Sequence, residues 1–205
     1  MTAQFATIHR FRQWPQDESE TWGRALVAEL LGDQRPRATL VLGRLDGTDG
    51  AVVALWDEAA DAEAAAGSGD GARWLDARVY RVVQRQHGTA VREAPRFAQV
   101  VWLNAGGGPD RADALVRAGR ERIAPAVQDV PGMIDTAVLR GDDDSIVVVT
   151  LVTDNSVPEV VQRAFLATPS LPWEDAATRG NPDRVDVQRV LDAHLRADVM
   201  ATVLS

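Results

Sequence analysis

Two stretches of this sequence are apolar on both faces of a strand, and they constrain the fold more than any other feature. They are Ala51–Trp56 (AVVALW) and Ile146–Val152 (IVVVTLV). A strand with one face in water alternates apolar and polar residues, so the lack of alternation predicts that both faces are buried. Helices can cover one face of such a sheet, and we expect a second sheet to cover the other.

Each stretch forms the second strand of a hairpin, and the hairpin occurs twice. The first copy, Ala38–Asp57, turns through the residues DGTDG at positions 46–50. The second copy, Val130–Leu151, turns at Asp142–Asp144. Short segments rich in Gly and Asp between apolar runs are typical of hairpin turns.

The elements around the hairpins also repeat, in the order strand, helix, hairpin, helix, strand. The first copy has strands at Phe5–Arg12 and Ala77–Arg85, with helices through Trp22–Leu31 and Glu58–Ala66. The second copy has strands at Phe97–Leu103 and Asp186–Leu191, with helices through Leu115–Val130 and Val157–Leu166. Pro125 should bend or split the first of these two helices. A pattern that recurs in the same order indicates a repeated structural unit.

We therefore predict an α+β chain of two tandem ferredoxin-like β-α-β-β-α-β repeats, whose antiparallel sheets pack face to face as an eight-stranded barrel. The predicted boundaries are 1–88 for the first repeat, 89–96 for a linker, 97–195 for the second repeat and 196–205 for a C-terminal tail. The alternative is two separate domains that each pair with another chain.

The composition limits the partners and the chemistry. A net charge of -8 and a pI near 4.9 disfavour nucleic acid or an anionic membrane as the main partner. The absence of cysteine excludes thiolate catalysis and disulfides, and every basic residue is arginine. No apolar run approaches the roughly 20 residues of a membrane span, and the opening residues do not resemble a signal peptide. We expect a cytoplasmic protein.

The chain resembles the dimeric α/β barrel superfamily and, within it, the antibiotic biosynthesis monooxygenase (ABM) group. The residues that carry the likeness are Pro131-Gly132-Met133, Val138-Leu139-Arg140 and the helix start Thr153–Ser156, with a looser copy at Leu42-Gly43-Arg44 and Trp56–Ala59. The resemblance implies an intrachain dimeric α/β barrel. Members of the superfamily include cofactor-free oxygenases, haem-degrading enzymes, polyketide cyclases and proteins without known chemistry, so the fold does not fix the activity.

The resemblance also implies which residues could be catalytic. Family enzymes use Asn, Trp, Arg, Tyr or His around a cavity between sheet and helices, and here the candidates are Asn104, Trp102 and His9. Trp102 and Asn104 are two apart and should project to one face of a strand. His9 lies within a strand and could serve as a general base. The alternative for Asn104 is that it starts the glycine-rich loop that follows.

Candidate substrate-binding residues are mostly aromatic. Trp22, Trp56 and Tyr80 could wall a flat substrate, together with Trp74, although ordinary core packing is the alternative for each. Arg81 and Arg189 occupy equivalent positions in the two repeats and could bind a phenolate or carboxylate. The alternative is that both arginines point outward and pair with surface acids.

The sequence predicts no cofactor and no metal site. The three histidines lack metal-ligand spacing, and the helix histidine of haem-degrading relatives has no counterpart in Glu58–Ala66 or Val157–Leu166. Our hypothesis is an ABM-like small-molecule protein, a cofactor-independent monooxygenase acting on an aromatic or polyketide-like substrate. The alternatives are a non-catalytic ligand-binding or structural protein and a polyketide cyclase-like enzyme. The expected partner is a small aromatic molecule; the two halves form a pseudo-dimer, and a further homodimer stays open.

Overall fold

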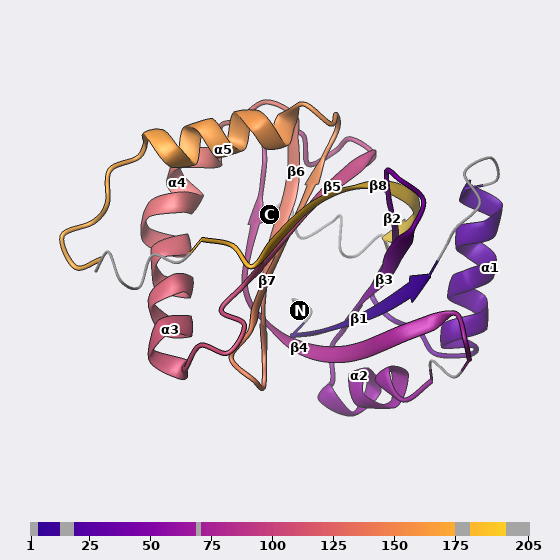
Figure 1. The fold of residues 1–205 in the computed structure, drawn as a ribbon. Helices are drawn as coiled ribbons and strands as arrows, with labels where there is room; N and C mark the ends of the chain where they lie inside the picture. The colour runs from indigo at the N-terminus through magenta and orange to yellow at the C-terminus, as the bar shows by residue number, and fades with distance from the viewer. Residues whose placement is uncertain (1–3, 13–18, 69–70, 175–180, 196–205) are drawn as a thin grey trace. The chain divides into compact units, whose positions relative to one another are not determined.

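The computed structural model describes residues 4–12, 19–68, 71–174 and 181–195, and it confirms the predicted fold class. The chain is α+β, and the described strands form a closed antiparallel barrel in the order β1-β3-β2-β8-β5-β7-β6-β4 (Figure 1). None of the described helices combines the length and the apolar character needed to cross a lipid bilayer.

The same order of elements occurs in both halves of the chain. The first half contains β1 (Phe5–Arg12), α1 (Ser19–Leu31), β2 (Ala38–Arg44), β3 (Asp49–Trp56), α2 (Ala59–Ala66) and β4 (Trp74–His87). The second half contains β5 (Phe97–Leu103), α3 (Pro109–Ala118), η1 (Gly119–Ile123), α4 (Ala124–Val127), β6 (Met133–Gly141), β7 (Ile146–Val152), α5 (Val157–Ala167) and β8 (Arg184–Leu195).

The compact units of the structure do not follow the predicted repeat boundaries. Unit 1 contains residues 1–82 and 188–205, and unit 2 contains residues 83–187. Strands β4 and β8 each begin in one unit and end in the other, because each pairs with strands of both halves of the chain. The repeats at 1–88 and 97–195 therefore describe the order of elements along the chain, and as domain boundaries they remain a prediction.

Unit 1 is a sheet in the order β4-β1-β3-β2-β8 with two helices. Helix α1 contacts β2, and α2 contacts β1 and β3. The helices and one face of the sheet share a buried apolar cluster that includes Phe11, Leu26, Val52, Trp56 and Ala62. Strand β3 is buried along nearly its whole length, on both faces, as its lack of alternation predicts.

Gly50 of β3 lies where β2 and the Phe11 ring pack closely against β3. A Cβ atom at Gly50, in β3, would lie 2.2 Å from the Leu42 carbonyl oxygen and 2.4 Å from the Phe11 ring. No real Cβ makes contacts this short, so only glycine allows β2 and the Phe11 ring to approach β3 at this point.

Unit 2 has β7 between β5 and β6, and both faces of β7 are largely buried. The helix predicted to bend or split at Pro125 stays contiguous from α3 to α4, and its hydrogen-bonding pattern changes just before Pro125. A five-residue π-helical segment, η1, separates α3 from α4, and Pro125 lies in the first turn of α4, where its missing N–H is tolerated. Arg122 of η1 forms a buried ion pair with Glu174 at 2.9 Å, which holds the segment after α5 against η1.

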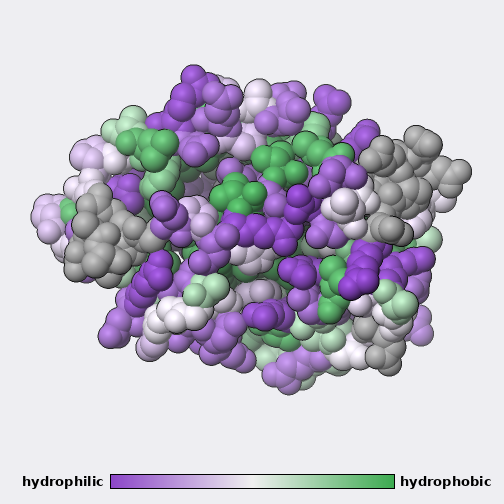
Figure 2. Space-filling view, viewed as in Figure 1, coloured by the Kyte–Doolittle hydropathy of each residue, from purple (hydrophilic) through white to green (hydrophobic). Residues whose placement is uncertain are grey.

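Hydrophilic residues dominate the face of the molecule shown in Figure 2, and apolar residues appear there in small groups. Among the described residues, the exposed large apolar side chains are Leu45, Val160, Leu166 and Val185. Isolated apolar side chains of this kind are normal on a protein surface.

Candidate functional site

The histidine of β1 is completely buried in unit 1. His9 pairs with Val52 on β3 and with Ala77 on β4, so it lies in the interior of the sheet. Alternate residues of a strand share a face, and His9 therefore shares its face with Thr7 and Phe11. Because Phe11 packs in the cluster with α1 and α2, this is the helix-covered face.

The imidazole of His9 makes no hydrogen bond with the residues that the structure describes. Both Nδ1 and Nε2 are buried without a hydrogen-bond partner among the residues that the structure describes. Burial lowers the pKa of His9 to about 4, and the negative charge of Asp76 acts in the opposite direction. The ring is therefore neutral at neutral pH, with one nitrogen able to accept a proton.

Aromatic side chains surround the same face of the sheet. The Trp74 ring meets His9 edge-on, with 6.0 Å between centroids. Phe11 lies 5.3 Å from Trp22 and 6.2 Å from Trp74, again edge-on. Trp56 is buried, and its Nε1 donates a hydrogen bond to Thr7 Oγ1 at 3.1 Å. The structure thus brings three of the four predicted aromatic candidates to the face that carries His9.

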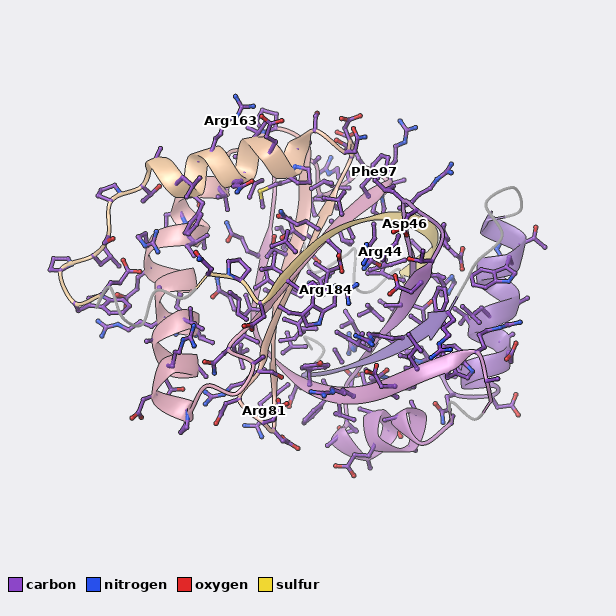
Figure 3. All side chains as sticks on the ribbon, viewed as in Figure 1. Arg44, Asp46, Arg81, Phe97, Arg163 and Arg184 are labelled. Carbon is purple, nitrogen blue, oxygen red and sulfur yellow. The ribbon has the colours of Figure 1, made fainter. Side chains whose placement is uncertain are left out.

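The other candidates of unit 1 lie elsewhere. Tyr80 is buried but pairs with Ala6, which is on the opposite face of β1 from His9. Arg81 and Arg189 are both exposed, and Figure 3 labels Arg81. The exposure of both arginines agrees with the alternative of outward-pointing side chains, and their role in binding remains a prediction.

Trp102 and Asn104 belong to unit 2, and they do not continue one strand face. Strand β5 ends at Leu103, and Asn104 has a φ of 65°, so the alternation stops before it. The Asn104 amide donates to the Asp144 carbonyl oxygen at 2.7 Å, while its Oδ1 is buried without a partner among the described residues. The Trp102 ring stacks on the Arg184 guanidinium at 4.8 Å. The hydrogen bond to Asp144 holds the loop after β5 in place. A catalytic role for Asn104 or Trp102 remains a prediction.

A groove of about 720 Å³ lies in unit 1, where the sequence indicates no site. It is lined by the second half of α1, the connection to β2 and the end of β8. Its polar lining includes Thr39, Asp192 and His194. The sequence pattern predicts that the last strand ends at Leu191, whereas β8 continues to Leu195 and places Asp192 and His194 beside β2.

The comparisons with known proteins identify the fold. No family model matches the sequence, and no curated protein matches it. Among solved structures, an anthrone oxidase-like protein has a TM-score of 0.62 at 11% identity, with 94% of this chain and 93% of that chain covered. A candidate monooxygenase of Fusobacterium nucleatum has a TM-score of 0.63 at 9% identity, with 96% of both chains covered. The chain shares the fold of these two proteins, and its strands form a closed antiparallel barrel.

The fold also occurs in a protein that is described as a regulator. A major regulator of staphylococcal pathogenesis also matches, with a TM-score of 0.54 at 10% identity over 90% of this chain and 98% of that chain. Identities this low carry the fold and no activity. All three histidines of this chain lie on strands: His9 on β1, His87 on β4 and His194 on β8.

Proposed function

We propose that the protein oxidises an electron-rich aromatic molecule with molecular oxygen, without a bound cofactor, and that His9 is the proton acceptor. The observation that carries this proposal is the neutral imidazole of His9, buried with neither nitrogen paired among the described residues. Groups of this kind cluster at functional sites, because function and not stability keeps them in place.

The energetic argument points to a partner outside the protein. A buried donor or acceptor without a hydrogen bond costs about 1–3 kcal/mol, and His9 has one of each. A leucine of similar size would avoid that cost. A ligand that exchanges a proton with Nδ1 or Nε2 would remove it, and the rings of Trp22 and Trp74 supply flat apolar surface on the same face.

The chemistry balances with oxygen as the only oxidant. His9 accepts the proton of an acidic C–H or O–H bond on the substrate, which leaves a carbanion or phenolate. This anion passes one electron to O₂, and the two radicals combine to form a C–O bond. The proton held by His9 then completes the hydroperoxide. Loss of water from the hydroperoxide gives the ketone, so one oxygen atom enters the product and the other leaves as water.

The buried site of His9 disfavours an imidazolium alone but can hold an imidazolium next to a substrate anion. Burial disfavours the imidazolium by itself, which is why the pKa of His9 is low. A substrate anion formed beside it would attract the imidazolium strongly in a medium of low dielectric constant. The Asp76 charge also favours the imidazolium.

A substrate must displace part of the cover to reach His9, and α2 is the short helix that packs against β1, the strand of His9. The helix has eight residues, and only its small side chains Ala62 and Ala65 are buried. Glu58 at its N-cap makes no capping hydrogen bond with its side chain. A short helix with little buried apolar area opens more easily than the rest of the sheet cover.

The direct test is oxygen consumption with anthrone and substituted hydroquinones, in the absence of added metal or flavin. We expect one O₂ consumed per anthrone and anthraquinone as the product. His9→Gln should lower the rate by about 10²-fold or more, the usual effect of losing a general base. Arg163→Gln is the matched control, because Arg163 on α5 is exposed and projects away from the ribbon (Figure 3).

Two results would contradict the proposal. One is that wild type oxidises no member of the panel above the uncatalysed rate. The other is that folded His9→Gln protein, checked by circular dichroism, oxidises anthrone as fast as wild type does. In the first case the second candidate, non-catalytic binding of a small molecule, is favoured by the groove beside α1.

A further inference from the structure

The groove beside α1 lies on the helix-covered face of the sheet, as His9 does, but several strands away from His9. Within the sheet of unit 1, β3 and β2 stand between β1 and β8. Three interstrand steps of roughly 4.8 Å separate the two outer strands by roughly 14 Å. Neither His9 nor any tryptophan lines the groove. Ligand binding in this groove is therefore independent of the oxidation proposed for His9.

The groove has an apolar middle. Val27, Ala28 and Leu31 of α1 line it, with Pro36 from the connection and Ala193 from β8. Its volume of about 720 Å³ lies within the usual range for small-molecule sites of about 300–1,000 Å³. The size and the apolar lining fit a ligand with a flat two-ring skeleton.

One end of the groove carries a carboxylate. A Cβ atom at Gly23 would lie 2.9 Å from the Asp192 Cβ, so the start of α1 lies directly against Asp192. Arg24 Nε is 3.9 Å from Asp192 Oδ1, and the Asp192 side chain is 14% exposed. A carboxylate has about four acceptor positions on its two oxygens, so it can accept a ligand's hydroxyl in addition to its protein partners.

The other end carries an arginine and several polar groups. Arg35 follows the end of α1, and Thr39 pairs with His194 across β2 and β8. Residues 24 and 31 of α1 are separated by roughly 10 Å along the helix axis, at 1.5 Å per residue. The two polar ends are therefore about as far apart as the hydroxyl and carboxylate oxygens of a naphthalene that carries these groups at opposite ends.

The cationic group at the second end of the groove is Arg35. Its Nη2 lies 3.9 Å from Asp33 Oδ1, and both side chains are exposed, so water weakens this pair and Arg35 can also bind an anion. A guanidinium binds a carboxylate through two parallel hydrogen bonds. Carbonyl groups at the end of α1 would repel an anion, but those of Ala28 and Leu31 already accept hydrogen bonds from Gly32 and Gln34.

We propose that this groove binds a small aromatic acid that also carries a hydroxyl group, with its carboxylate at Arg35 and its hydroxyl at Asp192. The rings would lie on Val27, Leu31 and Pro36, and Thr39 and His194 would offer further hydrogen bonds to the carboxylate.

Calorimetric titration with 6-hydroxy-2-naphthoate tests the proposal. We expect saturable binding of one ligand per chain. Each comparison ligand lacks one of the two polar groups: 2-naphthol lacks the carboxylate and 2-naphthoate lacks the hydroxyl. Both should bind at least roughly tenfold more weakly, because each loses a hydrogen bond to a charged group.

Variants locate the site. Ala28→Trp fills the groove from an exposed position on α1 and should abolish binding, while Arg35→Gln should weaken it by roughly tenfold. Arg163→Gln removes an exposed arginine from unit 2 and should leave the affinity unchanged. His9→Gln should leave it unchanged as well, which separates this site from the proposed oxidation.

The proposal is overturned if 6-hydroxy-2-naphthoate shows no saturable binding, or if folded Ala28→Trp protein binds it as wild type does. Equal affinities for the acid and for 2-naphthol would overturn the assignment of an anion. Circular dichroism and the urea midpoint of each variant establish that lost binding does not come from lost folding.

Discussion

Replacing His9 by leucine should stabilise the protein at neutral pH while removing the proposed activity. The imidazole is completely buried and has one donor and one acceptor without partners among the described residues. Removing these two groups recovers their desolvation penalties, about 1–3 kcal/mol each and about 2–6 kcal/mol together, and leucine fills a similar volume. We expect His9→Leu to raise the free energy of unfolding at pH 7 by about that amount.

The same substitution should change how stability depends on pH. The pKa of His9 is about 4 in the folded protein, against an ordinary value of 6.5 for histidine. The unfolded chain therefore binds more protons than the folded chain between these values, and stability falls as the pH falls through this window. Moving from pH 7 to pH 4.5 should cost wild type about 2 kcal/mol through this residue alone. His9→Leu lacks that contribution.

Urea denaturation followed by tryptophan fluorescence, at pH 7 and pH 4.5, measures both effects. The variant should be more stable than wild type at pH 7, and its advantage should grow by about 2 kcal/mol at pH 4.5. His194→Gln, at an exposed position, controls for the loss of one histidine. A variant less stable than wild type at pH 7, with the same pH dependence as wild type, would refute the reasoning.

The remaining predictions concern packing. Arg122→Leu leaves the Glu174 carboxylate, whose side chain is 2% exposed, without its cation and should cost about 3–5 kcal/mol in urea denaturation. Adding Glu174→Leu to that variant should recover part of the loss, and an unchanged loss would show that the buried charge is not its cause. Gly50→Ala would place a methyl group 2.2 Å from the Leu42 carbonyl oxygen. It should cost about 3 kcal/mol, and a stability equal to wild type would contradict the packing described for β3.

The strands are predictable because their pattern is local. The runs at Ala51–Trp56 and Ile146–Val152 have no alternation, and both form strands buried on two faces. Pro125 is also informative, because a residue without an N–H must lie near the start of a helical segment. In each case a few neighbouring residues determine the outcome.

The pairing of the strands is not local, and this limits the prediction of units and sites. Strands β4 and β8 extend beyond their predicted ends because pairing with distant strands holds their last residues. The groove could not be predicted for the same reason, because only the pairing of β8 with β2 positions Asp192 and His194. Nothing in the sequence around Asp192 and His194 indicates that β2 is the strand with which they pair.

Individual side chains follow the same rule. His9 is predicted to lie in a strand, and it does. Whether its nitrogens find hydrogen-bond partners depends on side chains of other elements, and none of the described ones supplies a partner. Asn104 is predicted to share a face with Trp102, which holds only if the strand continues. Its positive φ ends the strand, as asparagine tolerates that conformation better than most residues.

The measurement that tests the central claim most directly is histidine ¹⁵N NMR, with His9 assigned from His9→Gln. The chain has three histidines, so the spectrum is simple. We predict that His9 stays neutral down to about pH 4 in the free protein. Under anaerobic conditions at pH 7, saturating anthrone should convert its signals to those of an imidazolium as the anthrone anion appears in the absorption spectrum. A His9 signal that titrates near 6.5, or that does not respond to anthrone, would contradict the account.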